Sequence, residues 1–184
     1  MAGWTTLVQA ETLSVGLARP DVVVLDCRFD LADTNAGANA WMQAHIPGAR
    51  YAHLDRDLSG PLQASQGRHP WPDAADFRER LGGWGISPET QVVTYDGDTG
   101  AFAARAWFLL RMLRHEKVAV LDGGWKRWIG LGLPVDNKLP VPIAAKYHAE
   151  FDARRILDAD QVADALQAGE LLVGTMDCWV IWKL

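Results

Sequence analysis

Residues 91–107 read QVVTYDGDTGAFAARAW, and this stretch predicts both a fold class and a candidate site. An apolar run leads into a loop with two glycines and two aspartates, and an alanine-rich helical pattern follows. When a strand leads through a glycine-rich loop into a helix, the loop amides and the positive helix end converge on one point. That geometry favours an anion, so the candidate cradle loop consists of Asp96, Gly97, Asp98, Thr99 and Gly100.

The same alternation of strand and helix extends to both sides of this loop. Continuous β-branched runs such as VVVLD (22–26) suit strands that are buried on both faces of a parallel sheet. Helices are expected over 5–18, 73–85, 101–114 and 125–132, and strands over 22–26 and 117–124 and within 45–55 and 87–96. The pattern therefore predicts an α/β fold with a central, mostly parallel sheet and helices on both faces.

Domain organisation follows from where this pattern stops and restarts. Residues 1–136 form one complete unit, and the proline-containing, mixed-polarity segment 137–153 is typical of a linker. The stretch RILDADQVADALQAGELLV (155–173) then repeats the plan of the opening segment, an amphipathic helix followed by an apolar strand. Residues 154–184 are therefore expected to be the truncated start of a second unit.

Composition and charge narrow the classes of partner. The 184 residues are 49% apolar and 22% charged, and the net charge is −5 with scattered basic residues. This pattern argues against nucleic acid or an anionic membrane surface as the main partner. No apolar run approaches the roughly 20 residues of a membrane span, and the first residues lack the pattern of a secretory signal, so a cytoplasmic location is expected.

The first position of the cradle loop leaves three interpretations open. A thiolate there would become a nucleophile, whereas a carboxylate there could accept a phosphoryl group with the help of magnesium. Asp96 stands first and Asp98 follows two residues later, so a phosphatase with an aspartate nucleophile is an alternative. Such enzymes usually carry this motif on the first strand of the chain, which argues against it. In the simplest interpretation, the two aspartates only cap the turn and the helix.

Four blocks of sequence together resemble the first domain of the tandem rhodaneses, the family of thiosulfate and 3-mercaptopyruvate sulfurtransferases. The blocks are VVVLDCRFDLAD (22–33), HIPGARYAHLDRDLSGP (45–61), VVTYDGDTGAFAARAWFLLR (92–111) and VAVLDGGWKRW (118–128). The resemblance implies a rhodanese-like fold for the first unit. In that family two domains face each other, and only the second carries a reactive cysteine. Its thiolate takes a sulfur atom from a donor as a persulfide and passes it to an acceptor such as cyanide.

The resemblance also implies roles for individual residues. Asp96 occupies the position that the nucleophilic cysteine has in the second domain, so no catalytic residue is expected in this chain. Asp55 and His69 match residues that the first domain contributes to substrate binding. A small sulfur donor is the implied substrate, and neither a cofactor nor a metal is expected. In keeping with this, no ligand spacing links the five histidines, which are His45, His53, His69, His115 and His148.

Departures from the family pattern shape the expected activity. Gly174 stands where the second domain should have the aspartate of an Asp-x-Arg turn, and no second cradle loop follows before Leu184. Cys27 is expected to be a packed, inert thiol, and Cys178 has no glycine cradle. The chain is therefore expected to be inactive alone and to self-associate through an uncovered domain face. A non-catalytic module that binds an anion or a partner is the alternative.

Overall fold

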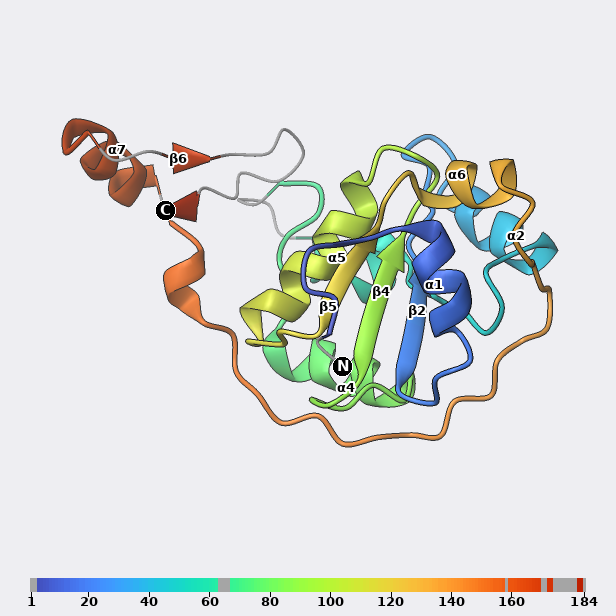
Figure 1. Cartoon of the computed structure of the whole chain (residues 1–184). Helices are drawn as coiled ribbons and strands as arrows, with labels where there is room; N and C mark the ends of the chain where they lie inside the picture. The colour runs from blue at the N-terminus through green and yellow to red at the C-terminus, as the bar shows by residue number, and fades with distance from the viewer. Residues whose placement is uncertain (1–2, 63–66, 158, 170–171, 174–181, 184) are drawn as a thin grey trace.

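The computed structural model describes residues 3–62, 67–157, 159–169, 172–173 and 182–183 (Figure 1). Its centre is a five-stranded sheet with the order β1-β5-β4-β2-β3, in which every neighbouring pair is parallel. The strands are β1 (Leu7–Val8), β2 (Val22–Asp26), β3 (Arg50–Tyr51), β4 (Gln91–Tyr95) and β5 (Val118–Leu121). This arrangement confirms the predicted α/β class with a parallel sheet.

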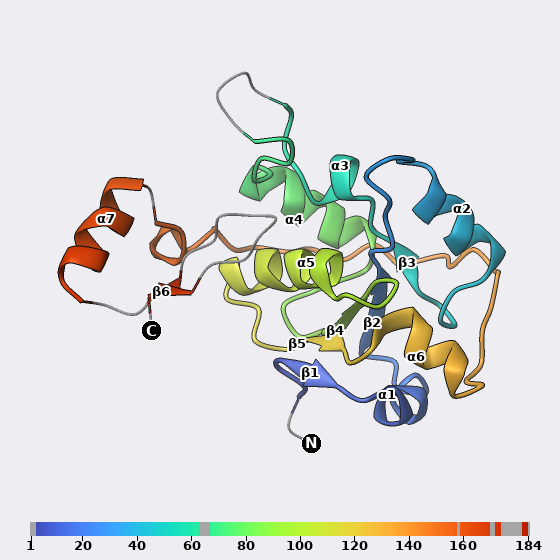
Figure 2. The same cartoon turned by 90° about the horizontal axis from the view of Figure 1, so that it is seen from above.

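Helices cover both faces of the sheet, as predicted. Those of the domain are α1 (Ala10–Gly16), α2 (Ala36–Gln43), α3 (Leu54–Asp57), α4 (Ala74–Gly83), α5 (Ala101–Met112) and α6 (Gly124–Gly130). Helices α4 and α5 lie on one face, and α1 and α6 lie on the other (Figure 2). Successive strand residues point to opposite faces. Val23 and Leu25 therefore pack in the cluster with α4 and α5, whereas Val24 packs in the cluster with α1 and α6.

The opening segment differs from its predicted helix. Leu7 and Val8 form a strand that pairs in parallel with Val120 and Leu121 of β5, and helix α1 begins only at Ala10. At the open edge of β5 the backbone groups of these two apolar residues gain hydrogen-bond partners. The apolar spacing of the segment does not reveal this pairing. Helices α2 and α3 were not predicted either, because both are short and neither has a wide apolar stripe.

Residues 144–152, here called the strap, pack against the domain although their composition is typical of a linker. The Ala145 amide donates to the Gly82 carbonyl at 3.0 Å, and the Asp152 amide donates to the Met112 carbonyl at 2.8 Å. A Cβ at Gly82 would lie 2.5 Å from the Ala145 carbonyl oxygen, so glycine allows this close approach. The side chain of Tyr147 is buried in the core cluster with α4 and α5. The strap is thus held at both of these helices.

The segment beyond the strap contains a short 3-10 helix η1 (Ala153–Arg155), helix α7 (Ala159–Gln167) and strand β6 (Leu172–Val173). The order of helix and strand agrees with the repeat expected over 155–173. Strand β6 pairs in antiparallel fashion with β7 (Trp182–Lys183), a pairing that the sequence did not suggest. Among the described residues, no helix has both the length and the apolarity to cross a membrane. The domain boundaries at 136 and 153 stay predictions.

Candidate functional site

The cradle loop begins directly after β4 and ends where α5 begins, and its anion is the side chain of its own first residue. The Asp96 carboxylate accepts the amides of Gly100 at 2.9 Å through Oδ1, and of Phe102 and Ala103 at 3.0 and 3.2 Å through Oδ2. Asp96 is only 1% exposed. Three N–H groups at the start of a helix neutralise a buried charge well. The capping expected of Asp96 is therefore present, with both of its oxygens engaged.

A second segment fixes the backbone of the same loop. The amides of Trp125 and Lys126 donate to the carbonyls of Asp96 and Gly97 at 2.8 and 2.9 Å. Gly124 has a φ of +53°, and a Cβ there would lie 2.6 Å from the Asp96 carbonyl oxygen. Only glycine combines that backbone conformation with so close an approach. The loop is therefore held from α6 as well as from α5.

The remaining polar residues of the loop face solvent or make local contacts. Asp98 lies 3.4 Å from the Lys126 ammonium in an exposed ion pair. The Thr99 hydroxyl oxygen is 3.4 Å from the Ala101 amide. Gly100 has a φ of +78°, which turns the chain into α5. Neither Asp98 nor Thr99 contacts the buried carboxylate of Asp96 through any hydrogen bond of the described residues.

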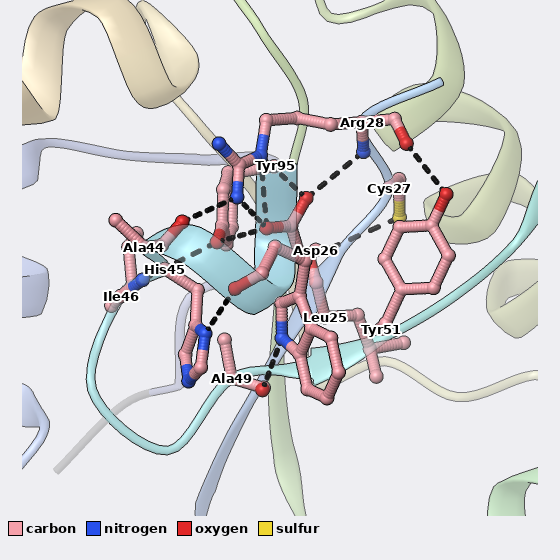
Figure 3. A network of polar contacts seen from close by, with 11 residues as sticks. Leu25, Asp26, Cys27, Arg28, Ala44, His45, Ile46, Ala49, Tyr51 and Tyr95 are labelled. Carbon is pink, nitrogen blue, oxygen red and sulfur yellow. Dashed lines mark hydrogen bonds and ion pairs between the residues drawn. The ribbon is translucent and has the colours of Figure 1, made fainter. Parts of the chain in front are cut away.

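The adjacent strand β2 ends in a second buried aspartate, Asp26, and the side chains of Arg28 and Tyr95 neutralise it (Figure 3). The Arg28 Nε donates to both carboxylate oxygens of Asp26 at 3.0 Å, and its Nη2 donates to Oδ2 at 2.6 Å. The Tyr95 hydroxyl donates to Oδ2 at 2.5 Å. The guanidinium of Arg28 also lies 4.4 Å from the ring centroid of Trp125. Arg28 is therefore engaged on Asp26, and the loop after β2 does not present a free guanidinium to an anion.

Cys27 directly follows Asp26 in the loop after β2 and is buried, as expected of a packed thiol. Burial raises the pKa of the Cys27 thiol well above its ordinary value, and the charges of Asp26 and Asp96 raise it further. Such a thiol is not ionised at neutral pH and is not a nucleophile. Cys178 lies outside the described residues.

The structure brings Asp55 and His69 together. The His69 Nε2 lies 3.0 Å from the Asp55 Oδ1, with the side chains 13% and 40% exposed. The ring N–H is not aligned with that oxygen, so the two polar atoms lie close together without a well-formed hydrogen bond. Burial lowers the pKa of His69, and the Asp55 carboxylate partly offsets this effect. The ring is therefore neutral at pH 7 and can donate one hydrogen bond and accept another.

His69 borders a cavity of about 230 Å³ beside the first turn of α5. The lining residues are Leu31, Leu54, Arg68, His69, Ala101, Phe102 and Arg105. Ala101 and Phe102 directly follow the cradle loop, so the cavity lies next to the site predicted from sequence. Its walls combine apolar side chains with a few polar groups, as small-molecule sites do.

The sequence pattern did not reveal Arg105, yet this residue holds the segment that carries His69. Its Nε donates to the Leu58 carbonyl at 2.8 Å, and its Nη2 donates to the carbonyls of His69 and Pro70 at 2.9 and 3.0 Å. A guanidinium suits this task because it presents several donors in a fixed plane. The available signal was an arginine among the alanines and aromatic residues of the first two turns of helix 101–112.

Curated proteins with similar sequences match this chain over most of its length. A "Probable 3-mercaptopyruvate sulfurtransferase" of Pseudomonas aeruginosa is 43% identical over 155 residues, which cover 83% of this chain and 55% of that protein. A "Thiosulfate sulfurtransferase" of Cricetulus griseus is 32% identical over 163 residues, which cover 86% of this chain and 53% of that protein. The chain thus spans about half the length of the curated relatives that it matches.

Solved structures agree on the fold. A 3-mercaptopyruvate sulfurtransferase from Leishmania major superposes with a TM-score of 0.76 at 24% identity, over 86% of this chain and 44% of that one. A 3-mercaptopyruvate sulfotransferase from Escherichia coli gives 0.73 at 22% identity, over 91% and 63% of the respective chains. The family model of the rhodanese-like domain matches residues 9–131, which contain strands β2 to β5, both loops and the cavity. The chain therefore belongs to the rhodanese family.

Proposed function

We propose that this chain is the non-catalytic, first-domain half of a sulfurtransferase. The reaction of the whole protein would be sulfur transfer from thiosulfate or 3-mercaptopyruvate to a thiophilic acceptor such as cyanide, through a cysteine persulfide. The sulfurtransferase names of the curated relatives support this activity class. Because the chain spans about half of those relatives, the reactive cysteine would belong to the other half.

One observation carries the non-catalytic assignment, namely that the Asp96 carboxylate fills the cradle. All three converging amides are taken up by its two oxygens, so neither a thiolate nor a substrate anion has a place there. Cys27 gives no substitute, since it is buried and its pKa is raised. We therefore expect the chain alone to form no persulfide.

The contribution of this half would come from the pair Asp55 and His69. A neutral His69 can donate a hydrogen bond to a carboxylate or carbonyl oxygen of a sulfur donor in the adjoining cavity. Arg68 lines the same cavity and adds a positive charge that suits an anionic donor. Thiosulfate and 3-mercaptopyruvate are both anions of a size that fits this class of cavity. The choice between the two donors stays open.

Two other functions are less well supported. In a phosphatase, Asp96 would have to attack phosphorus, but both of its oxygens are buried and hydrogen-bonded, while Asp98 is exposed and pairs with Lys126. Within the part of the chain that the structure describes, no group of three or more His, Cys, Asp or Glu residues could hold a metal ion. A non-catalytic module that binds a partner or an anion remains the alternative. The cytoplasmic location, the truncation and self-association likewise stay predictions.

The experiment that tests the proposal is sulfur transfer to cyanide by the purified 184-residue chain. Thiosulfate and 3-mercaptopyruvate are offered in turn, thiocyanate is measured, and circular dichroism verifies that the chain is folded. We expect no thiocyanate above the level without protein. Cys27→Ser and Cys178→Ser are the matched variants. Activity in the native chain that one of these substitutions abolishes would overturn the assignment and identify that cysteine as a nucleophile.

A second measurement addresses the proposed role of His69. Addition of 3-mercaptopyruvate should shift the imidazole signals of His69 in the NMR spectrum, whereas those of the exposed His148 should stay in place. A donor that shifts neither ring would contradict a donor-binding role for this half.

A further inference from the structure

His53 is a histidine at a place where helices usually have serine, threonine, aspartate or asparagine. It is the N-cap of the single turn α3, and it is only 4% exposed. Its Nδ1 accepts the amides of Asp55 and Arg56 at 3.1 and 3.4 Å. Its Nε2 lies 3.1 Å from the Thr34 carbonyl oxygen. Because a carbonyl can only accept, Nε2 must carry the proton, and the lone pair of Nδ1 faces the two amides.

The turn is held reciprocally from its other end. The His53 amide donates to the Asp57 Oδ2 at 2.8 Å, as in a capping box. Arg80 of α4 lies 3.0 Å from the Asp57 Oδ1. The His53 ring is packed edge-on against Phe29 and Tyr51, with ring centroids 5.1 and 6.0 Å apart. The ring can therefore neither flip nor leave its position without moving several neighbours.

The residue that this cap orients is Asp55. His53 holds the Asp55 amide, and the Asp55 carboxylate lies 3.0 Å from the His69 Nε2. We propose that His53 is a positioning residue, whose neutral imidazole caps α3 so that the Asp55 carboxylate stays beside His69. The inference takes its functional meaning from the proposed role of Asp55 and His69, but it concerns only their geometry.

A histidine cap can be switched off by acid. Protonation would place an N–H on Nδ1, directly against two backbone N–H donors, and both cap bonds would be lost. The charged groups that face the ring are Arg56, Asp55 and Asp57 of α3, and Arg80 lies beyond Asp57. Burial lowers the pKa of His53 and Arg56 lowers it further, while Asp55 and Asp57 oppose them. The cap is therefore complete at neutral pH and is weakened as the pH falls.

The test is an NMR titration of the His69 ring in the whole, histidine-labelled chain, with assignment through a His69→Asn variant. Asp55→Asn measures how far the pKa of His69 falls when the carboxylate is removed. His53→Leu removes the cap, so the pKa of His69 should fall by at least half of that amount. His53→Asn supplies an amide oxygen to the same two N–H groups and should restore the native value. His148→Leu, which changes an exposed histidine, is the matched control.

A double-substituted chain separates positioning from general damage to the fold. If His53 acts through Asp55, then adding His53→Leu to Asp55→Asn should not change the pKa of His69 again. An equal further fall in the double variant would overturn the inference, and so would a native pKa of His69 in His53→Leu. If His53→Leu does not fold, two measurements still test the inference. They are the pKa of His69 in His53→Asn and the titration of the native chain at low pH. In the native chain, the Asp55 signals must then respond to His53 protonation as well as to that of His69. None of these measurements requires sulfur transfer, so an inactive chain leaves them unaffected.

Discussion

The carboxyl ends of β2 and β4 each carry a buried aspartate, and the two carboxylates are stabilised in different ways. The two strands are adjacent and parallel, and Asp26 and Asp96 are 0% and 1% exposed. Asp26 is neutralised by the side chains of Arg28 and Tyr95, whereas Asp96 is neutralised by three backbone amides. A buried carboxylate costs several kcal/mol unless it is paired or hydrogen-bonded, so both arrangements are needed for the fold.

The difference determines what each loop can do. Side-chain partners can be changed one at a time, and Arg28 is no longer available to any ligand because it is bound to Asp26. Backbone amides belong to the fold itself and remain when the side chain that they bind is changed. The β4 loop thus keeps the form of an anion cradle and is filled by the chain itself. Substitutions that separate these two strategies should differ in size, and we order them from the largest effect to the smallest.

Arg28→Met should be the most destabilising change. It removes the cationic partner of Asp26 and leaves a buried carboxylate with two uncharged donors, the Tyr95 hydroxyl and the backbone amide of residue 28. We expect the free energy of unfolding to fall by about 3–5 kcal/mol, measured by urea denaturation. The double variant Asp26→Asn with Arg28→Met should be more stable than Arg28→Met alone, because the unpaired charge is gone. If Arg28→Met cost less than the double variant, the pair would not be the main source of stability in this loop.

Asp96→Ala should have an intermediate effect. The three amides lose their acceptor, but they lie at a helix start where water or an anion can replace it, so we expect a loss of about 2 kcal/mol. Thiosulfate should restore part of that stability in Asp96→Ala and none in the native chain, whose cradle is filled. Thermal unfolding with and without thiosulfate measures both. An equal response of the two proteins would show that the cradle amides do not bind the anion.

Tyr147→Phe tests a third arrangement, in which two neutral side chains satisfy each other. The His115 Nε2 lies 2.9 Å from the Thr90 carbonyl oxygen and so carries the proton, and the Tyr147 hydroxyl donates to Nδ1 at 2.8 Å. Removing that hydroxyl should cost about 1 kcal/mol. Limited proteolysis should cut the strap of this variant sooner than that of the native chain. A variant as stable and as resistant as the native chain would show that the Tyr147 hydroxyl contributes nothing to holding the strap.

The free energy of unfolding should depend on pH through His115, the buried histidine that Tyr147 contacts. Burial lowers the pKa of His115, so the unfolded chain binds a proton at higher pH than the folded chain does. Stability is complete above the ordinary value of about 6.5 and falls as the pH drops through that value toward the folded one. His53 and His69 act in the same direction. His115→Gln should flatten the dependence below about pH 6.5.

Lys126→Ala should have the smallest effect. Its ion pair with Asp98 is in the same loop as Asp96, but the Lys126 side chain is 77% exposed. Exposed pairs contribute about 0–1 kcal/mol, and we expect less than about 0.5 kcal/mol here. If this variant were as unstable as Asp96→Ala, burial would not be what distinguishes the two aspartates of the loop.

Sequence reasoning found the elements with strong local signals. The runs at 22–26 and 91–95 and the glycine-rich loop between strand and helix were predicted at nearly their observed positions. Elements that form through contacts with residues distant in the sequence have weaker local signals. Leu7 and Val8 form a strand because β5 lies beside them, and the strap packs against the domain through its contacts with Gly82 and Met112 and through the burial of Tyr147. Arg105 donates to backbone carbonyls that are distant in the sequence. His53 caps a helix although histidine is not a usual N-cap residue. Residue type and spacing therefore did not reveal either role.

By itself, the sequence determined the α/β class, the parallel sheet and a glycine-rich loop that begins with Asp96. These properties follow from apolar periodicity and from single positions in a motif, and both can be read locally. Only the tertiary structure decided what Asp96 binds, that Asp55 meets His69, and that Arg28 is engaged on Asp26. The reason is physical, since the pairing and the pKa of a polar group depend on burial and on partners within a few ångströms. Those partners come from other strands and helices and are brought near only when the chain folds.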